Sequence, residues 1–137
     1  MSETCRYEEL AHTADVGMRV YGATPEALFA CAALSLFALM GGVPGEPTGW
    51  RRLELVADDT ESLLVAWLNE LLYLSETSGQ VLADVRVVAW TPSSIVADIM
   101  CAPPRTPPQT MIKAVTYHRL RLVEQPTGWL ADYYVDV

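Results

Sequence analysis

The feature that most constrains the fold is a run of apolar residues that has no polar face. Residues 27–43 are apolar on nearly every side of a helix, and Ser35 is the one polar interruption. Pro25 stands at the start, where its missing N–H costs nothing, and Gly41 and Gly42 end the run. A length of about 17 residues is at or below the short limit for crossing a bilayer, and these caps are typical of globular helices. We therefore expect a helix buried in a core and covered on both sides, not a membrane span.

A second helix is expected after residue 58, and its pattern has two faces. Asp58 is placed to cap it, with Glu61 in the capping-box position three residues later, and Gly79 is placed to end it. Leucines recur at helical spacing on one side, whereas the opposite side is polar. We expect the polar side, around Asn69 and Glu70, to face solvent or a partner.

Seven alternating or β-branched segments separated by turn residues are candidate strands: residues 7–10, 17–22, 50–57, 81–89, 94–101, 112–123 and 129–137. From them we expect a sheet of about six strands. Residues 102–110 contain four prolines and are expected to form an exposed loop, neither helix nor central strand. The pattern predicts one α+β domain over residues 1–137. We expect a two-layer sandwich, with both helices packed on one face of a mixed, mainly antiparallel sheet.

Composition narrows the function classes. The chain has 9 Lys and Arg against 17 Asp and Glu, a net charge of −8, and 51% of its 137 residues are hydrophobic. The apolar content excludes disorder as the dominant state. The acidic balance disfavours direct, non-specific nucleic-acid binding, because such binding depends on Lys and Arg that neutralise phosphates.

The cysteines and the N-terminus bear on the compartment. Cys5, Cys31 and Cys101 are an odd, widely spaced set without a C-x-x-C pair, which fits neither a disulfide scaffold nor a thiolate zinc site. The first residues lack the basic start and apolar stretch of a signal peptide. We expect a cytoplasmic protein with no membrane segment.

Two acidic positions at opposite ends of the sequence are candidate metal ligands. Asp15 closes a polar loop that begins at His12, and a carboxylate with backbone carbonyls is a typical start of a hard-cation site. Asp136 precedes the terminal carboxylate of Val137, and two neighbouring anions repel unless a cation joins them. The plainer alternatives are an Asp that turns the backbone, a His that bonds the backbone, and a solvated chain end.

The strand at 112–118 adds basic candidates. In a regular strand Lys113 and His118 lie on opposite faces, so we expect them not to share a site, and His118 is interpreted as structural. Lys113 is either an edge residue that discourages aggregation or a counter-charge to the acidic ends. The sequence has no phosphate-binding loop, nucleophile elbow or zinc motif, so no nucleophile and base pair is visible.

Three separated segments resemble the archease family in order and spacing. They are the loop HTADVG at 12–17, the helix piece WLNELLY at 67–73 and the strand IKAVTYH at 112–118, which is followed by VDV at 135–137. Archeases are small acidic proteins that activate the RtcB-type, GTP-dependent RNA ligase of tRNA splicing and RNA repair. The resemblance implies that this chain promotes guanylylation and multiple turnover of such a ligase and is not itself an enzyme, with RNA contacted only through the ligase.

The resemblance also implies a metal pocket. It falls on Asp15 and Asp136, with backbone oxygen near Val137, and such oxygen ligands suit Ca²⁺ or Mg²⁺. His12 is expected at the pocket wall, and Lys113 is expected to contact the ligase or a phosphate. The chain departs from the family before the 112–118 strand, where the proline-rich residues 102–110 replace a stretch that is usually acidic.

Two other functions remain open at this stage. One is a metal-dependent phosphoester hydrolase at the Asp15 and Asp136 pocket, for which no general base is evident. The other is a chaperone-like modulator of a different RNA-processing enzyme, such as an RNA methyltransferase.

Overall fold

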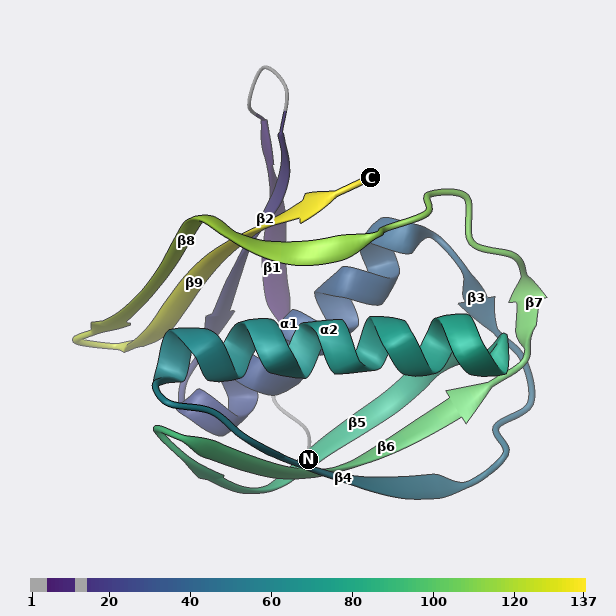
Figure 1. Ribbon diagram of the computed structural model, residues 1–137, viewed down its shortest axis with the longest axis horizontal. Helices are drawn as coiled ribbons and strands as arrows, with labels where there is room; N and C mark the ends of the chain where they lie inside the picture. The colour runs from purple at the N-terminus through teal and green to yellow at the C-terminus, as the bar shows by residue number, and fades with distance from the viewer. Residues whose placement is uncertain (1–4, 12–14) are drawn as a thin grey trace.

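The computed structural model describes residues 5–11 and 15–137, and this part of the chain forms nine strands and two helices (Figure 1). In chain order they are β1 (Arg6–Ala11), β2 (Val16–Gly22), α1 (Pro25–Met40), β3 (Val43–Pro44), β4 (Trp50–Val56), α2 (Thr60–Ser78), β5 (Val81–Thr91), β6 (Ser94–Ala102), β7 (Pro104–Thr106), β8 (Ala114–Gln125) and β9 (Gly128–Asp136). The segments predicted as strands are confirmed, with ends that differ by a few residues.

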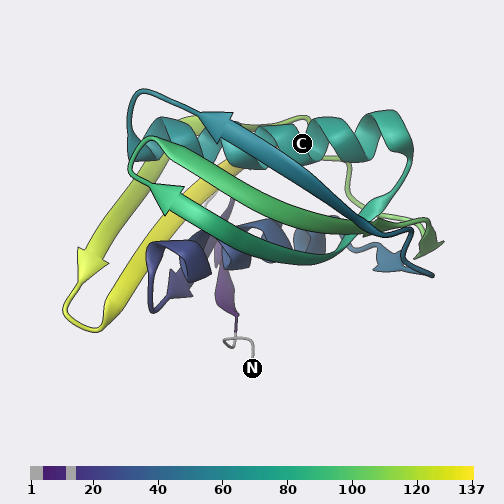
Figure 2. The ribbon, with the colours of Figure 1, turned by 90° about the horizontal axis from the view of Figure 1, so that it is seen from below.

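The strands form three antiparallel sheets. Their orders are β1-β2-β9-β8, β4-β6-β5 and the small pair β3-β7. Helix α1 packs against β2 and β5, and α2 packs against β8 and β4, so each helix contacts both larger sheets. Figure 1 shows the helices between these two sheets, and in Figure 2, seen from below, β4, β5 and β6 lie nearest the viewer. The predicted α+β class, with two helices and mainly antiparallel strands, is confirmed.

The strands are divided among several sheets, whereas the sequence predicted a single one. The physical reason lies in α1, whose residues are buried on nearly every side, including Leu28, Phe29 and Leu36 at 0% exposure. One sheet can cover only one face of such a helix, so a second layer is needed on its far side.

The first helix has the predicted start and end. The Thr24 side chain accepts a hydrogen bond from Ala27 N at 3.1 Å, and Gly41 takes the left-handed conformation at φ 85°. Its polar interruption is satisfied inside the core, because the Ser35 hydroxyl lies 2.8 Å from the Tyr133 hydroxyl and donates to a helix carbonyl. Burial raises the pKa of Tyr133, so this buried pair stays neutral.

The second helix corrects one predicted residue. Its N-cap is Asp59, not Asp58: Asp59 is extended at φ −149° and its carboxylate accepts from Ser62 N at 2.7 Å. The capping side chain must belong to the last non-helical residue, and the helix begins one residue later than the capping-box pattern suggests. Gly79 ends it with φ 73°, as expected.

The proline-rich segment contains a short strand that the sequence did not indicate. Residues of β7 pair with β3 in a two-stranded sheet, apart from the two larger ones. Prolines are tolerated there because each of the two strands has an open edge. The prediction that this segment is neither helix nor central strand is confirmed.

The cysteine prediction is wrong in one respect. Cys5 and Cys31 form a disulfide that ties the chain before β1 to the buried middle of α1, with their Cα atoms 5.0 Å apart. Sequence separation alone gives no sign of such an approach, because it depends on how β1 folds over α1. Cys101 is free and half-buried, and burial raises the pKa of its thiol. The cysteines therefore no longer support the predicted cytoplasmic location, which stays a prediction.

The helix formed by the apolar run is α1, buried between sheets as expected. Neither helix in residues 5–11 and 15–137 is long and apolar enough to cross a membrane.

Candidate functional site

The strand registers bring together the acidic residues that lie far apart in sequence. Strand β2 pairs with β9 so that Val16 is opposite Val135, which places Asp15 across from Asp136 at the same end of the sheet. Asp15 lies just before β2 and Asp136 is the last residue of β9, although 121 positions separate them in the chain. The predicted convergence of Asp15 and Asp136 is therefore consistent with the sheet register.

Lys113 lies at the same end of the sheet, just before β8, which pairs with β9 on the side opposite β2. Strand β8 pairs with β9 through Ala114 and Asp136, and the Lys113 N–H donates to the Asp136 carbonyl at 2.8 Å. Continuing this register places Lys113 beside Val137. The backbones of Asp136, Val137 and Lys113 thus lie side by side at the end of β9.

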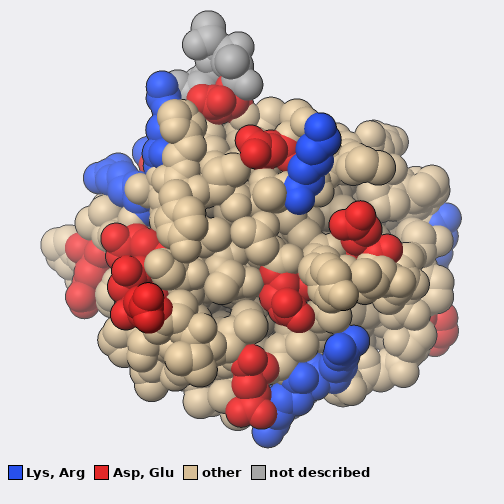
Figure 3. All heavy atoms as spheres, in the orientation of Figure 1, with Lys and Arg blue, Asp and Glu red and all other residues tan. Residues whose placement is uncertain are grey.

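The site is open to solvent. The Asp15 side chain is 37% exposed, and Asp136 and Val137 are exposed. Figure 3 shows acidic side chains below the residues drawn in grey and basic side chains to their left. His12 lies outside the described residues. Among the residues that the structure describes, no three His, Cys, Asp or Glu side chains form a ready metal cluster.

The chemistry of the predicted donors fits a hard cation. Carboxylates such as those of Asp15 and Asp136, and a backbone oxygen near Val137, are oxygen ligands of the kind that Ca²⁺ and Mg²⁺ use. Their exposure leaves room for water molecules to complete the coordination of either ion.

His118 lies beside Asp15, which the face argument did not anticipate. Its Nε2 lies 3.4 Å from Asp15 Oδ2, and Arg119 Nε lies 3.9 Å from the same oxygen. The prediction assumed a regular strand, but the β8–β9 register shifts between Thr116 and Arg121, and residues 117–120 lie opposite Tyr133 alone. The bulge redirects His118 toward Asp15, just before β2.

The glycine of the first motif has a packing role beside this bulge. A Cβ atom on Gly17 would lie 2.5 Å from ring carbons of Tyr134, which is opposite it in the register. The His118 ring in turn meets the edge of Tyr134, with centroids 6.5 Å apart. Gly17 therefore lets an aromatic ring lie flat across β2, and that ring supports His118.

Asn69 has a different role from the predicted one. Its side-chain amide donates to the Val115 carbonyl at 3.0 Å and its amide oxygen accepts from Val115 N at 2.8 Å. Asn69 is half-buried and fastens α2 to β8, so it is not part of an exposed docking face. These two hydrogen bonds fix the position of β8 relative to α2. Lys113 lies just before this strand, and His118 lies in its bulge.

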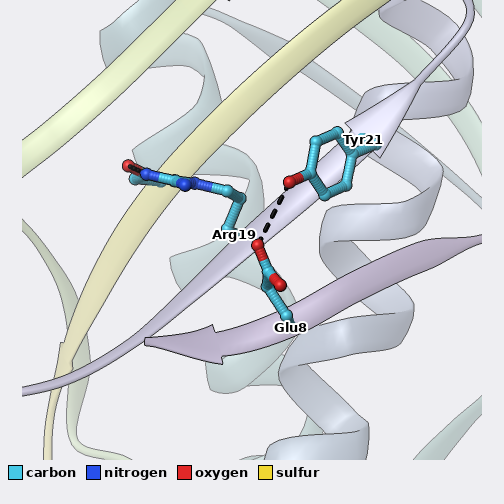
Figure 4. Close-up of polar contacts among 4 residues, drawn as sticks. Glu8, Arg19 and Tyr21 are labelled. Carbon is cyan, nitrogen blue, oxygen red and sulfur yellow. Dashed lines mark hydrogen bonds and ion pairs between the residues drawn. The ribbon is translucent and has the colours of Figure 1, made fainter. Parts of the chain in front are cut away.

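A row of alternating charges crosses the outer face of the same sheet. Glu8, Arg19, Asp132 and Arg121 are neighbours through the registers of β1, β2, β9 and β8. The Arg19 guanidinium donates to both oxygens of buried Asp132 at 2.7 and 2.9 Å, and this hydrogen bonding raises the pKa of Arg19. The Tyr21 hydroxyl donates to Glu8, as Figure 4 shows. The row secures the registers that set the site.

A pocket of about 560 Å³ lies beside Lys113, between the C-terminal half of α2 and residues 108–113. Its lining is mostly apolar, with Leu72 and Ile112 among the wall residues and Glu76 at the rim. Residues 108–110 of the proline-rich segment thus form part of the wall of a pocket that Lys113 also lines.

Comparisons with known proteins agree with this geometry. The sequence profile of the Archease protein family matches residues 7–137. A curated relative named protein archease from Methanosarcina acetivorans is 38% identical, with 99% of each chain covered. One of the same name from Thermococcus kodakarensis is 34% identical, covering 96% of this chain and 99% of that one.

Solved structures show the same fold. The solution structure of protein 1598 from Methanobacterium thermoautotrophicum has a TM-score of 0.71 and 25% identity, covering 96% of this chain and 98% of that chain. A Thermotoga maritima crystal structure, described as an archease and possible chaperone, has a TM-score of 0.70 and 22% identity, covering 95% and 96%. Since sequence profile, curated relatives and fold agree over nearly the full length, the chain belongs to the archease family.

Proposed function

We propose that the protein is a non-enzymatic activator of an RtcB-type, GTP-dependent RNA ligase. It would promote guanylylation of the ligase and its multiple turnover in tRNA splicing and RNA repair. The observation that supports the proposal is the β2–β9 register, which sets the backbones of Asp15 and Asp136 at one solvent-exposed sheet end in a chain of the archease family. The description of the Thermotoga maritima relative as a possible chaperone supports a role exerted on another protein.

The acidic site would hold a divalent cation, Ca²⁺ or Mg²⁺. Asp15, Asp136 and a backbone oxygen near Val137 are the proposed ligands, and His12 is proposed for the wall. When bound, the cation supplies positive charge that neutralises phosphate oxygens. The chain's own residues hold this charge at the surface, where a partner's nucleotide site can reach it.

Lys113 is proposed to contact the ligase or a phosphate. Its backbone is fixed by the hydrogen bond to Asp136, while the side chain is exposed beside the pocket at residues 108–113. A flexible ammonium in this position can approach a phosphate from the side opposite Asp15. RNA would be contacted only through the ligase, in keeping with the net charge of −8.

The test is joining of a 3′-phosphate RNA to a 5′-hydroxyl RNA by the cognate ligase with GTP. Sub-stoichiometric wild-type protein should raise the number of turnovers, and Asp15→Asn or Asp136→Asn should abolish that increase. Asp58→Asn is the matched control, because Asp58 is an exposed aspartate that does not cap α2. Full stimulation by both site variants would exclude the acidic site from the activity.

The same assay addresses the alternatives. No stimulation by wild-type protein of an active ligase would reject the proposed partner. Release of phosphate from phosphoesters by the protein alone, lost in Asp15→Asn, would instead establish a hydrolase.

A further inference from the structure

The bulge of β8 forms an arm that points two basic side chains at Asp15. Arg119, at φ 57°, is the one non-glycine residue with positive φ in the described part of the chain. A backbone that strains an L-residue in this way is kept where the surrounding structure needs the direction it gives. Here that direction brings both Arg119 and His118 to the acidic site.

Both arm residues contact one oxygen. His118 Nε2 is 3.4 Å and Arg119 Nε is 3.9 Å from Asp15 Oδ2, and all three side chains are partly exposed. The guanidinium is charged at every accessible pH. In the arrangement that the structure shows, the carboxylate therefore already has a positive partner without any metal ion.

We infer that the arm of His118 and Arg119 competes with a cation for Asp15. This inference rests on the proposed metal site. A divalent ion on Oδ2 would lie within about 4 to 6 Å of a fixed positive charge, a distance at which like charges repel measurably even in water. Binding of the ion and contact of the arm with Asp15 therefore oppose each other.

The competition sets the affinity of the site. Each ion that binds must displace the arm, so the arm lowers affinity and keeps the site exchangeable. The displaced arm remains tethered, because His118 packs on the edge of Tyr134 and the bulge is flanked by paired residues on both sides. The arm returns to Asp15 when the ion leaves, and the ion state changes the surface presented by residues 117–120.

Direct binding measurements test this inference without a ligase. Ca²⁺ is titrated by calorimetry and Tb³⁺ by luminescence at fixed pH and low ionic strength. Arg119→Asn removes the charge with a residue that tolerates positive φ, and it should bind Ca²⁺ about three- to tenfold more tightly than wild type. Arg119→Lys keeps the charge and should stay within twofold.

Two further variants complete the design. Arg121→Asn is the matched control, since it makes the same change in net charge on the same strand but lies in register with Asp132. Its effect should be clearly smaller than that of Arg119→Asn. His118→Asn removes the other arm residue and should also tighten binding. If Arg119→Asn fails to fold, the increase in Ca²⁺ affinity of His118→Asn tests the inference instead.

The outcomes separate the two proposals. If wild type binds Ca²⁺, Asp15→Asn loses it, and both arm variants bind with wild-type or weaker affinity, the competition is rejected while the metal site stands. If wild type binds neither Ca²⁺ nor Tb³⁺, nor Mg²⁺ titrated by calorimetry in the same way, the metal site is rejected and the competition with it.

Discussion

Replacing Asn69 with alanine should loosen β8 from α2 and lower the melting temperature of the protein. The Asn69 amide makes two hydrogen bonds with the backbone of Val115, at 3.0 and 2.8 Å, and thereby substitutes for a neighbouring strand. Alanine removes both bonds and leaves the Val115 N–H and carbonyl without this partner at a half-buried position.

The size of the effect follows from these two bonds. Loss of two bonds to partly buried backbone groups costs about 2 to 3 kcal/mol. Alanine recovers about 0.6 kcal/mol as the better helix former, so the net loss is about 1.5 to 2.5 kcal/mol. Unfolding entropy near 60 °C is about 2.1 cal/mol/K per residue, or about 0.29 kcal/mol/K for 137 residues. The melting temperature should therefore fall by about 5 to 9 °C.

Differential scanning calorimetry measures the shift, and hydrogen exchange measures its location. The Val115 amide should exchange faster in Asn69→Ala. The exchange rates of core amides in α1 should change only as much as the loss of global stability requires. Glu70→Ala is the control, because none of the hydrogen bonds identified among the described residues uses the Glu70 side chain. A shift below 2 °C, or an equal shift in Glu70→Ala, would refute the reasoning.

Three other changes have expected outcomes of the same kind. Ser35→Ala should lower the free energy of unfolding by about 1 to 3 kcal/mol, more than Tyr133→Phe does. Ser35→Ala leaves the buried Tyr133 hydroxyl without this partner, whereas in Tyr133→Phe the serine keeps its bond to a helix carbonyl. Urea unfolding measures both variants, and the reverse order would contradict the assignment. A backbone N–H of the first turn holds the pKa of Asp59 below its ordinary 3.8, so its contribution is complete above that value and is lost as the pH falls below it. Asp59→Asn should flatten this part of the acid unfolding profile, and an unchanged profile would argue against the cap. Cys5→Ala should cost about 3 kcal/mol, because the disulfide closes a loop across 26 positions. A reducing agent should cost wild type the same and leave the variant unchanged, so a wild type that does not respond to reductant would contradict the pairing.

The helices and strands were predictable because local chemistry decides them. The run at 27–43 can only be buried, and Gly41 and Gly79 supply the left-handed ends that helices need. The pairing of Asp15 with Asp136 was predictable only through the family resemblance, since residue spacing does not tell which strands are neighbours. The register of β2 with β9 supplies this missing step.

Other features depend on tertiary approach and leave no sequence signal. The Cys5–Cys31 disulfide requires β1 to lie over α1, and the division into separate sheets follows from how α1 is covered. The position of His118 beside Asp15 was not predicted, because period-two alternation assumes a regular strand. A bulge changes the alternation, and the one local sign of it is the backbone of Arg119, a residue type that gives no warning of positive φ.

Guanylylation of the ligase tests the central claim most directly. The cognate RtcB-type ligase is incubated with labelled GTP, and formation of the covalent ligase–GMP species is followed with wild-type protein, Asp15→Asn, Asp136→Asn and the control Asp58→Asn. The account predicts faster guanylylation with wild type and the control and none of this gain with the two site variants. Equal guanylylation with all four proteins, or with no added protein, would contradict it.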